Sequence, residues 1–529
     1  MRPNDRRFFH YRLWPDGFVI ALRLTFERLS VALFFLAVAS AACLMPAQSD
    51  TWWHLRAGEE IWRLRSVPLR DSFSHTAYGG YWPDHEWLSQ ALFYGLYQIG
   101  GLKLLTAVLA AFMTATWILV WRVTPGSHWR RLLLVCLALV PSSLAWSLRP
   151  QVFTLFFLAL TVFLLTKGRL WWLPFLFLVW ANLHGAVLLG ILVMVAAVIG
   201  TALTNRRQAY HLLAVALSCV LATTMTPLGL SFWTEMPASI ARIDQIRISE
   251  WRAPQFADPV LLPFWLLMIG LVVLVALQKP WRNPQTLRNV AVTGALAIVP
   301  LALSAARNVP PLMLLAVPAI ATLLDASFRV KPSNAVRMQR PALNFAVLVA
   351  AVVVTAGSVL YAWSHEIEKL GWHPLPEQAI AAVAACPERL YNRYDEGGYL
   401  IWFVPNQRVF LDGRQDPYPP ELILEQLRLE SSGEYKATFE RYNIGCALIP
   451  SGSLVARQLT NAGWRTMYHD ATWAVFATPS LREHLGPDLL PRAEVELAIR
   501  DGQHHLSIGP VSLIDGSRRH APRGPQVVP

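Results

Sequence analysis

Acidic and imidazole side chains follow directly after the first long apolar run of the chain. The segment Ser49-Asp-Thr-Trp-Trp-His-Leu-Arg-Ala-Gly contains Asp50 and His54, four residues apart. A helix that begins at Ser49 or Asp50 would place both side chains on one face. A carboxylate in that position is suited to take a proton from an attacking hydroxyl group, as a general base does.

A simpler interpretation of this segment needs no chemistry. Asp50 would cap an interfacial helix, and Trp52, Trp53 and Trp62 would lie in an aromatic belt at the membrane surface. Glu59 and Glu60 would then be solvated charges on one face of that helix. Both interpretations predict a helix at this place.

A second polar cluster, Asp84-His85-Glu86, precedes the apolar run 88–99, which is too short to cross a bilayer and ends at Gly100-Gly101. We expect an interfacial helix there. The cluster either caps this helix with first-turn acids, or Glu86 or His85 folds back toward Asp50 to form a polar pocket. Neither cluster has the spacing of a strong metal motif such as HExxH.

Further polar residues interrupt apolar runs. Asn182 and His184 either form a satisfied helix end with a bend at Gly185, or provide the floor of a pocket under Asp50. Arg149 with Gln151, and Arg307 with Asn308, lie at the ends of predicted spans. Snorkelling explains each arginine singly, but together they suggest a phosphate site, with Arg307 favoured over Arg149.

Glu250 and Trp251 lie in a long loop predicted on the same side of the membrane as Asp50. We expect Glu250 either to contribute to the pocket from above or to belong to an interfacial amphipathic helix.

The composition indicates a membrane protein. Of 529 residues, 54% are hydrophobic and 15% are charged, and the mean hydropathy of +0.37 is too high for an ordinary soluble protein. The net charge of +12 is divided among short clusters between apolar runs, so it does not indicate a nucleic-acid surface. About eleven spans are predicted, at 30–46, 102–121, 132–147, 152–166, 170–182, 186–203, 210–226, 259–277, 287–305, 309–325 and 342–363.

The basic clusters predict the orientation of these spans. Segment 1–29 and the connectors 122–131, 167–169, 206–207, 279–288 and 329–340 carry the arginines and lysines, so we place them in the cytoplasm. The loops 47–101 and 227–258 and everything after residue 363 would then lie outside.

The segment 364–480 has the pattern of a small α/β domain. Short apolar runs (YLIWFV, RVFLDG, CALIP and WAVFATP) alternate with helical patterns at 375–385, 420–440 and 453–463, which predicts a mostly parallel sheet. Asn392, Asp395, Gly397-Gly398 and the segment 410–416 would lie at strand ends, although turn chemistry is the simpler role for Asp412-Gly413. Residues 481–529 are predicted to form a weakly ordered tail.

The five cysteines show no metal spacing. Cys386 and Cys446 lie in the outer domain, where they either form a disulfide or remain buried free thiols.

The membrane part resembles the GT-C superfamily of glycosyltransferases that use polyprenyl-phosphate sugars. It is most similar to uncharacterised bacterial proteins with the patterns D-x-W-W-H-L-x-x-G, W-x-x-x-E-W-L, W-x-N-L-H-G and E-W. These patterns read here as 50–58, 82–88, 180–185 and 250–251. One departure is that Asp50-Thr51 stands where many GT-C enzymes have Asp-Glu, so a second acid must come from elsewhere or be absent.

The resemblance implies an inverting hexosyl or pentosyl transfer from a polyprenyl-phosphate sugar to a glycan, lipid or protein acceptor in a bacterial inner membrane. Asp50 would be the general base, with His54 and Glu86 also catalytic. The donor and acceptor would be bound by His85, Asn182, His184, Glu250 and Arg307. No cofactor is assigned, although Mg²⁺ or Mn²⁺ would find ligands in His54, His85 or Glu86. The alternatives are a noncatalytic GT-C relative and a transporter or lipid-handling protein in envelope assembly.

Overall fold

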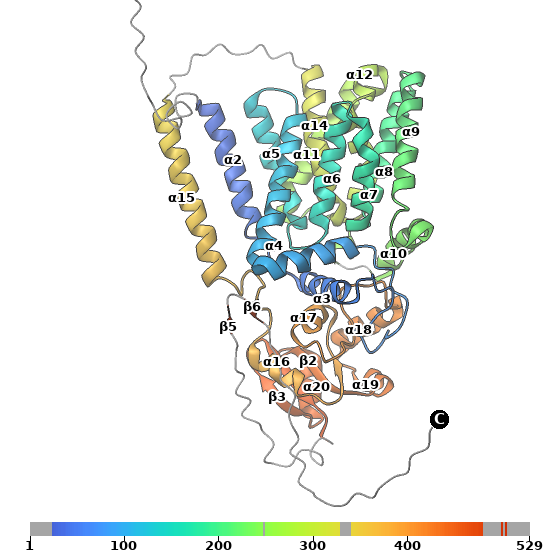
Figure 1. The fold of residues 1–529 in the computed structure, drawn as a ribbon, viewed down its shortest axis with the longest axis vertical. Helices are drawn as coiled ribbons and strands as arrows, with labels where there is room; N and C mark the ends of the chain where they lie inside the picture. The colour runs from blue at the N-terminus through green and yellow to red at the C-terminus, as the bar shows by residue number, and fades with distance from the viewer. Residues whose placement is uncertain (1–23, 247–248, 328–339, 480–498, 501–502, 505–529) are drawn as a thin grey trace, which may run out of the picture. The chain divides into compact units, whose positions relative to one another are not determined.

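The computed structural model describes residues 24–246, 249–327, 340–479, 499–500 and 503–504 (Figure 1). Residues up to His484 form one compact unit, and Leu485–Pro529 form another. In the second unit the described residues are two short antiparallel strands, β5 (Ile499–Arg500) and β6 (Gln503–His504). Most of the predicted segments 1–29, 329–340 and 481–529 lies outside the described residues.

Each predicted span coincides with a helix of the first unit. In chain order these helices are α2 (Phe26–Ala42), the second part of α4 (Trp87–Val123), α5 (His128–Ser142), α6 (Gln151–Thr166), α7 (Leu173–Leu183), α8 (Val187–Ala202), α9 (Arg206–Ala222), α11 (Leu262–Gln278), α13 (Val290–Ser304), α14 (Val309–Ser327) and α15 (Pro341–His365).

The helices differ in whether their length alone suffices to cross a bilayer. Four helical segments of the described chain are long and apolar enough, namely Trp87–Val123, Pro259–Arg282, Ala306–Ala326 and Pro341–His365. Others, such as α6 with 16 residues, are apolar but only about 24 Å long at 1.5 Å per residue, short of a hydrocarbon core of about 30 Å. The number of eleven crossings therefore stays a prediction.

Exposed apolar stripes on the bundle indicate where lipid would lie. On α11, Leu266, Ile269 and Val273 follow helical spacing and are each about half exposed. On α15 only Asn344, Val359 and Ala362 are buried. Apolar faces of this extent are unusual for a soluble protein and are expected against acyl chains.

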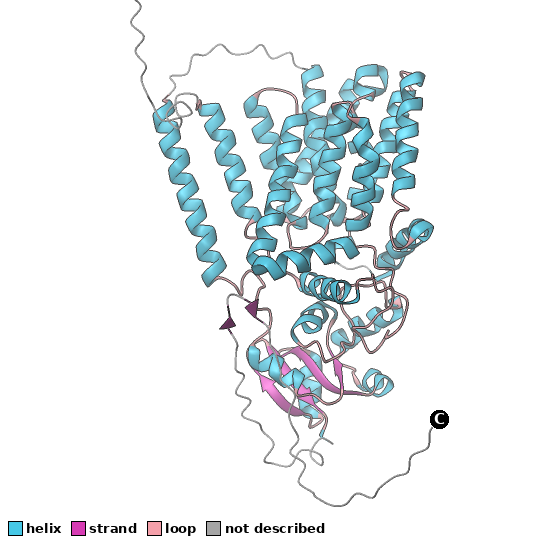
Figure 2. Ribbon diagram, viewed as in Figure 1, coloured by secondary structure: helices cyan, strands magenta, loops and turns pink. Residues whose placement is uncertain are grey.

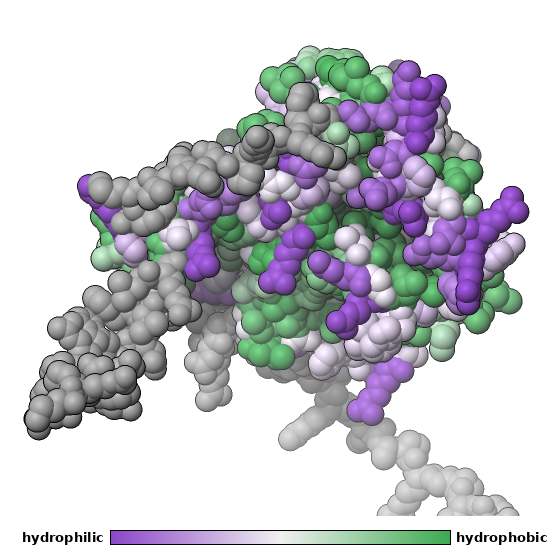
Figure 3. Space-filling model, turned by 90° about the horizontal axis from the view of Figure 1, so that it is seen from above, coloured by the Kyte–Doolittle hydropathy of each residue, from purple (hydrophilic) through white to green (hydrophobic). Residues whose placement is uncertain are grey.

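The two ends of the bundle differ. The loop predicted to lie outside at 47–101, the helix α10 (Phe232–Ile246) and the C-terminal domain gather at one end, and the short basic connectors lie at the other (Figure 1). Seen from the connector end, hydrophilic side chains are scattered over the face, with apolar ones between them and at its edge (Figure 3). This segregation matches the predicted division into loops, while the side of the membrane that each end faces stays a prediction.

The helix α4 confirms the predicted break at Gly100-Gly101. Its backbone leaves helical geometry at these two residues, and Gly101 has φ 59° and ψ −159°, a region that favours glycine. The part before the break lies across the end of the bundle and the part after it enters the bundle (Figure 1). The predicted interfacial helix at 88–99 is thus present as the first part of α4.

The C-terminal domain is α/β, but its sheet is not mostly parallel. The strands β1 (Arg389–Tyr391), β2 (Ile444–Pro450), β3 (Arg465–His469) and β4 (Trp473–Ala477) are ordered β1-β2-β4-β3. Only β1 and β2 are parallel; β2 with β4 and β3 with β4 are antiparallel (Figure 2). A tight return from β3 to β4 needs no crossover helix, which explains the antiparallel pairing.

Two predicted strands are wrong. YLIWFV belongs to the helix α17 (Tyr394–Phe403), and RVFLDG forms no strand beyond a single bridge between Val409 and Ser74. An apolar run buried on several sides has no period by which strand and helix can be told apart. The predicted helices are present as α16 (Glu377–Ala384), α18 (Pro420–Ser432), α19 (Lys436–Tyr442) and α20 (Leu454–Asn461).

Cys386 and Cys446 form a disulfide, with a Cα–Cα distance of 6.2 Å. It joins the end of the α16 segment to the central strand β2. Of the two alternatives left open by the sequence, the structure therefore has the bonded one.

Candidate functional site

The helix α3 (Ser49–Leu64) lies at the end of the bundle that the C-terminal domain covers (Figure 1) and carries Asp50 in its first turn. Asp50 is not the N-cap, because the helix begins at Ser49 and the cap position belongs to Gln48. Thr51 completes the helix start instead: its hydroxyl accepts the Gln48 amide at 3.0 Å and donates to the Leu148 carbonyl at 2.8 Å. The threonine that replaces the acid of many GT-C enzymes thus has a structural role here.

The tryptophans of α3 do not form an aromatic belt. Trp52 and Trp53 are buried, and Trp52 packs against Trp402 and Phe403 of α17. Only Trp62 is exposed. The expectation that Glu60 is solvated is also wrong, since it is buried and accepts a hydrogen bond from Ser72. The C-terminal domain covers this face of α3, which the sequence did not indicate.

Both carboxylate oxygens of Asp50 have partners. Arg149 Nη1 lies 2.8 Å from Oδ2, and Trp53 Nε1 donates to Oδ1 at 3.1 Å. Gly413 of the C-terminal domain lies against the same oxygen, so closely that a Cβ atom there would be 2.3 Å from Oδ1. The carboxylate is therefore held in one orientation, with a quarter of the side chain exposed to the pocket.

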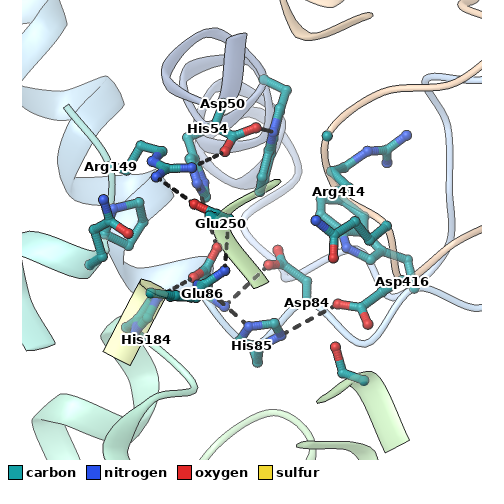
Figure 4. A pocket seen from close by; sticks show the side chains of 18 residues that line it. Asp50, His54, Asp84, His85, Glu86, Arg149, His184, Glu250, Arg414 and Asp416 are labelled. Carbon is teal, nitrogen blue, oxygen red and sulfur yellow. Dashed lines mark hydrogen bonds and ion pairs between the residues drawn. The ribbon is translucent and has the colours of Figure 1, made fainter. Parts of the chain in front are cut away.

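Glu250 continues this row of charges. Its Oε2 lies 3.4 Å from Arg149 Nη2 and its Oε1 lies 3.0 Å from Arg307 Nη1 (Figure 4). The Arg307 guanidinium also lies over the Trp251 ring, at 5.1 Å from its centroid. Asp50, Arg149, Glu250 and Arg307 therefore alternate in sign along one wall.

Glu86 lies on the other side of the pocket among three imidazole rings (Figure 4). The distances to its carboxylate oxygens are 3.2 Å from His184 Nε2, 3.5 Å from His54 Nε2 and 3.8 Å from His85 Nε2. The fold-back of this cluster onto the Asp50 helix is thus present: His54 and Asp50 come from α3, and Glu86 precedes α4.

The tautomer of His184 follows from its other nitrogen. The Ala186 amide donates to Nδ1 at 3.3 Å, and the Thr154 hydroxyl, which accepts from Trp180, lies 2.8 Å from the same atom. Nδ1 must then lack a proton, so Nε2 of the neutral ring carries it and donates to Glu86.

Burial and neighbouring charges shift the pKa values in the pocket. Burial raises the pKa of Asp84 to about 7 and also raises the pKa of Glu86, the latter against the opposing charges of His85 and Arg307. For His85, burial favours the neutral ring, but Glu86, Asp416 and Asp84 outweigh it and raise the pKa.

The pKa values of two other groups are lowered. Burial, followed by the charge of Arg149, lowers the pKa of His54 well below its ordinary value, so this ring is neutral. Burial alone would raise the pKa of Glu250, but Arg307 and Arg149 lower it, so this carboxylate is ionised. The pocket thus contains both a firmly ionised carboxylate and carboxylates that hold a proton more readily.

The C-terminal domain forms the remaining wall, with the residues Gly413, Arg414, Gln415 and Asp416. Asp416 lies 3.0 Å from Arg242 of α10 and 3.8 Å from His85 Nδ1. One carboxylate of the domain thus contacts both of the long loops, 47–101 and 227–258.

Arg414 anchors this wall. It is buried between the rings of Phe73 and Trp82, and its guanidinium pairs with Asp412 at 2.8 Å and Asp71 at 2.6 Å. Asp412 therefore does not only stabilise a turn, because it also pairs with the buried Arg414 guanidinium. A charged cluster with no exposed side chain fixes the relative position of the first outer loop and the domain.

The pocket unites most of the residues expected from the sequence and several that were not. Its lining consists of Asp50, Trp53, His54, Trp82, Asp84, His85, Glu86, Arg149, Pro150, Gln151, His184, Ser239, Glu250, Arg307, Gly413, Arg414, Gln415 and Asp416. Asn182 is not among them. Its amide accepts from Trp87 Nε1 and donates to the carbonyls of Leu178 and Met225, so it holds helices together.

Sequence reasoning did not assign Asp84, Asp416 or Ser239 to the site. A signal existed for Asp416, which closes the polar run 412–416, but the predicted strand before it is absent. Ser239, in the middle of α10, carries no signal in the sequence.

The arrangement does not fit a metal ion as it stands. Among the described residues no group of three His, Cys, Asp or Glu side chains is placed to hold one. Asp50 and Glu250 face arginines, and His184 presents an N–H to Glu86 rather than a lone pair.

No known protein family and no curated protein matches the sequence. Among solved structures the chain is similar to the oligosaccharyltransferase AglB of Archaeoglobus fulgidus in complex with an inhibitory peptide and a dolichol-phosphate. The TM-score is 0.47 at 8% identity, and the match covers 80% of this chain and 70% of that one. For the apo form of the Archaeoglobus fulgidus oligosaccharyltransferase the TM-score is 0.46 at 10% identity, with 79% and 69% covered. Similarity at this level assigns no donor, acceptor or activity to this chain.

Proposed function

We propose that this protein transfers a sugar from a polyprenyl-phosphate carrier to an acceptor hydroxyl group at the outer end of its helix bundle. The observation that carries the proposal is the wall on which Asp50, Arg149, Glu250 and Arg307 alternate. A proton acceptor and two anion-binding guanidinium groups lie there within one pocket, beside helices with lipid-facing apolar surfaces.

In the proposed reaction the Asp50 carboxylate accepts a proton, and the guanidinium groups stabilise the leaving phosphate. The acceptor oxygen attacks the anomeric carbon and loses its proton to the Asp50 carboxylate. The bond between that carbon and the phosphate oxygen breaks, and the phosphate leaves with the electron pair. Arg307 and Arg149 stabilise the charge that develops on the phosphate. Attack opposite to the leaving group inverts the anomeric centre.

Asp50 is suited to this role because it does not need to reorganise. Trp53 and Arg149 hold its two oxygens, and Gly413 packs closely against Oδ1. Preorganised groups of this kind avoid the cost of reorientation during the reaction.

Glu86 provides the second acid that the Asp50-Thr51 pair lacks. We propose that Glu86, with His54, His85 and His184 around it, binds hydroxyl groups of the sugar or the acceptor. His184 donates to the carboxylate and so orients it. The site in this proposal faces the periplasm or cell exterior of a bacterium, in line with the basic connectors at the opposite end.

The test is turnover by the purified full chain in nanodiscs with a panel of undecaprenyl-phosphate hexoses and pentoses. Asp50→Asn keeps a hydrogen-bond acceptor for Trp53 but loses the ion pair with Arg149 and cannot take a proton, so turnover is expected to fall about 10² to 10⁴-fold in a protein that still folds. Glu59→Gln is the matched control, since Glu59 pairs with Arg56 on the same helix outside the pocket lining.

The outcomes separate the alternatives. A wild-type rate for Asp50→Asn contradicts its assignment as the base. Donor binding by the wild type without any turnover favours the noncatalytic relative or the transporter. An Asp50→Asn protein that does not accumulate favours a structural role for this carboxylate.

A further inference from the structure

The seat between Arg149 and Arg307 is the space that the Glu250 carboxylate occupies between these two guanidinium groups. The side chains of Glu250 and Arg307 are each 30% exposed. Arg414 and its partners have no exposed side-chain surface, and the carboxylate that Arg242 holds is 6% exposed. The Asp50 side chain is 25% exposed, but one of its oxygens is held by Trp53 instead of a second arginine. Among these contacts the Glu250 seat therefore combines accessibility with two guanidinium groups.

The Glu250 carboxylate contacts the two arginines as a bound ligand anion would. Each of its two oxygens meets a different guanidinium group, at 3.4 Å and 3.0 Å. The two arginines come from segments far apart in the chain, and they converge on this one carboxylate. A tetrahedral phosphate presents a similar pair of oxygens to two arginines.

For a ligand to reach both arginines, only the side chain of Glu250 has to move. The backbone beside it is anchored, because the Ala306 amide donates to the Arg252 carbonyl at 2.9 Å and Trp251 lies under Arg307. Rotation of the Glu250 side chain toward solvent would free both arginines without a change of fold.

The charge around the seat limits what it accepts. The lining contains the five carboxylates Asp50, Asp84, Glu86, Glu250 and Asp416 against the three arginines Arg149, Arg307 and Arg414. Arg149 is shared with Asp50, and Arg414 is engaged by Asp71 and Asp412. A second phosphate group next to the first would face carboxylates with no uncommitted arginine in the lining.

We propose that the Arg149–Arg307 seat binds a single phosphate group in exchange for the Glu250 carboxylate. The ligand is then a lipid monophosphate or its sugar diester rather than a diphosphate. A sugar phosphodiester carries one negative charge and replaces the charge of Glu250 one for one. The released phosphate monoester carries up to two, so it binds more tightly than the donor and acts as a product inhibitor. The choice of a lipid as the carrier and the product inhibition rest on the proposed function.

The experiment measures binding by the full chain in uncharged nanodiscs. The probes are undecaprenyl phosphate, undecaprenyl diphosphate and inorganic phosphate, each titrated in the presence of a chelator. The variants are Glu250→Gln, the double variant Glu250→Gln/Arg307→Gln, and Glu59→Gln as the control for loss of one arginine-paired carboxylate.

Glu250→Gln is expected to bind undecaprenyl phosphate about tenfold or more tightly than the wild type, because the competing internal anion is gone. Glu59→Gln should bind as the wild type does, and the double variant should lose the gain. The affinity for undecaprenyl diphosphate should increase less in Glu250→Gln than the affinity for the monophosphate. Equal or weaker binding by Glu250→Gln, the same gain in Glu59→Gln, or a preference for the diphosphate would each overturn the inference.

The two remaining results separate this inference from the proposed function. A gain for inorganic phosphate without one for the lipid would retain the exchange and overturn the lipid as the carrier. The expected exchange together with no sugar transfer from any donor would support the phosphate seat while the glycosyltransferase proposal fails.

Discussion

Asp84 offers a direct test of the electrostatics of the pocket through protein stability. Its side chain is buried, with Oδ1 accepting from Gln90 Nε2 at 2.6 Å, while Oδ2 is buried and contacts no donor among the described residues. Burial raises its pKa from 3.8 to about 7. The folded state therefore keeps a proton on Asp84 that the unfolded chain releases above pH 4.

The sign and size of the effect of pH on folding stability follow from this difference in pKa between the folded and unfolded states. A raised pKa of an acid lowers stability progressively as the pH rises from about 4 to about 7, and the loss is complete above that range. A difference of about 3 pKa units, at about 1.36 kcal/mol each, amounts to about 4 kcal/mol at pH 8 and to less than half of that at pH 5.

Asp84→Asn removes the ionisation but adds a buried N–H₂ group where Oδ2 now lies. An unpaired buried donor costs about 1 to 3 kcal/mol. The net expectation is a gain of about 2 kcal/mol at pH 8 and almost none at pH 5.

The assay is thermal unfolding of the full chain in detergent, followed by tryptophan fluorescence, from pH 5 to pH 8. Asp325→Asn is the control, since Asp325 is exposed and pairs with Arg130 at the other end of the bundle. Lower stability of Asp84→Asn at pH 8, or a pH slope equal to that of the wild type, would refute the reasoning. The carboxylate would then be ionised in the folded protein.

Four further predictions concern how the two parts of the chain form the pocket. Gly413→Ala should displace the Asp50 carboxylate, since the new Cβ would lie 2.3 Å from Oδ1, and lower turnover at least about tenfold while the unfolding temperature stays within a few degrees; unchanged kinetics would mean that Asp50 need not keep its orientation. Arg414→Met leaves Asp71 and Asp412 buried without a cation and should cost about 3 to 5 kcal/mol in unfolding measurements, with partial recovery when both acids are changed to Asn. Without reductant, Cys386 and Cys446 should resist alkylation, and Cys386→Ser should lower the stability of the outer domain by about 2 to 4 kcal/mol; two alkylated thiols in the wild type would contradict the bond. Ser66→Cys and Ser451→Cys should be labelled by an impermeant maleimide in intact spheroplasts, and protection of both would reverse the predicted orientation.

Local features of the chain were predictable from the sequence because they depend on neighbours in sequence. The apolar runs predicted the helices of the bundle, since each must satisfy its own backbone groups. The break at Gly100-Gly101 followed from the conformational freedom of glycine, and the four-residue spacing predicted that Asp50 and His54 share one face of α3. Many of the polar pocket residues could also be identified, because polar side chains that interrupt or border apolar runs stand out in such a sequence.

The partners of these residues were decided by the tertiary structure. Glu86 meets His184, and Asp50 meets Arg149, only because α3, α4, α6 and α7 converge at one end of the bundle, and no spacing in the sequence encodes that convergence. The run YLIWFV lies in a helix that packs closely on α3: a Cβ on Gly398 would lie 2.1 Å from the Ser49 carbonyl. The same packing brings Gly413 to Asp50 and Asp416 to His85. Long-range packing of this kind depends on the shapes of surfaces formed by separate segments. Because of this packing, the C-terminal domain, which was predicted as a separate unit, forms one wall of the site.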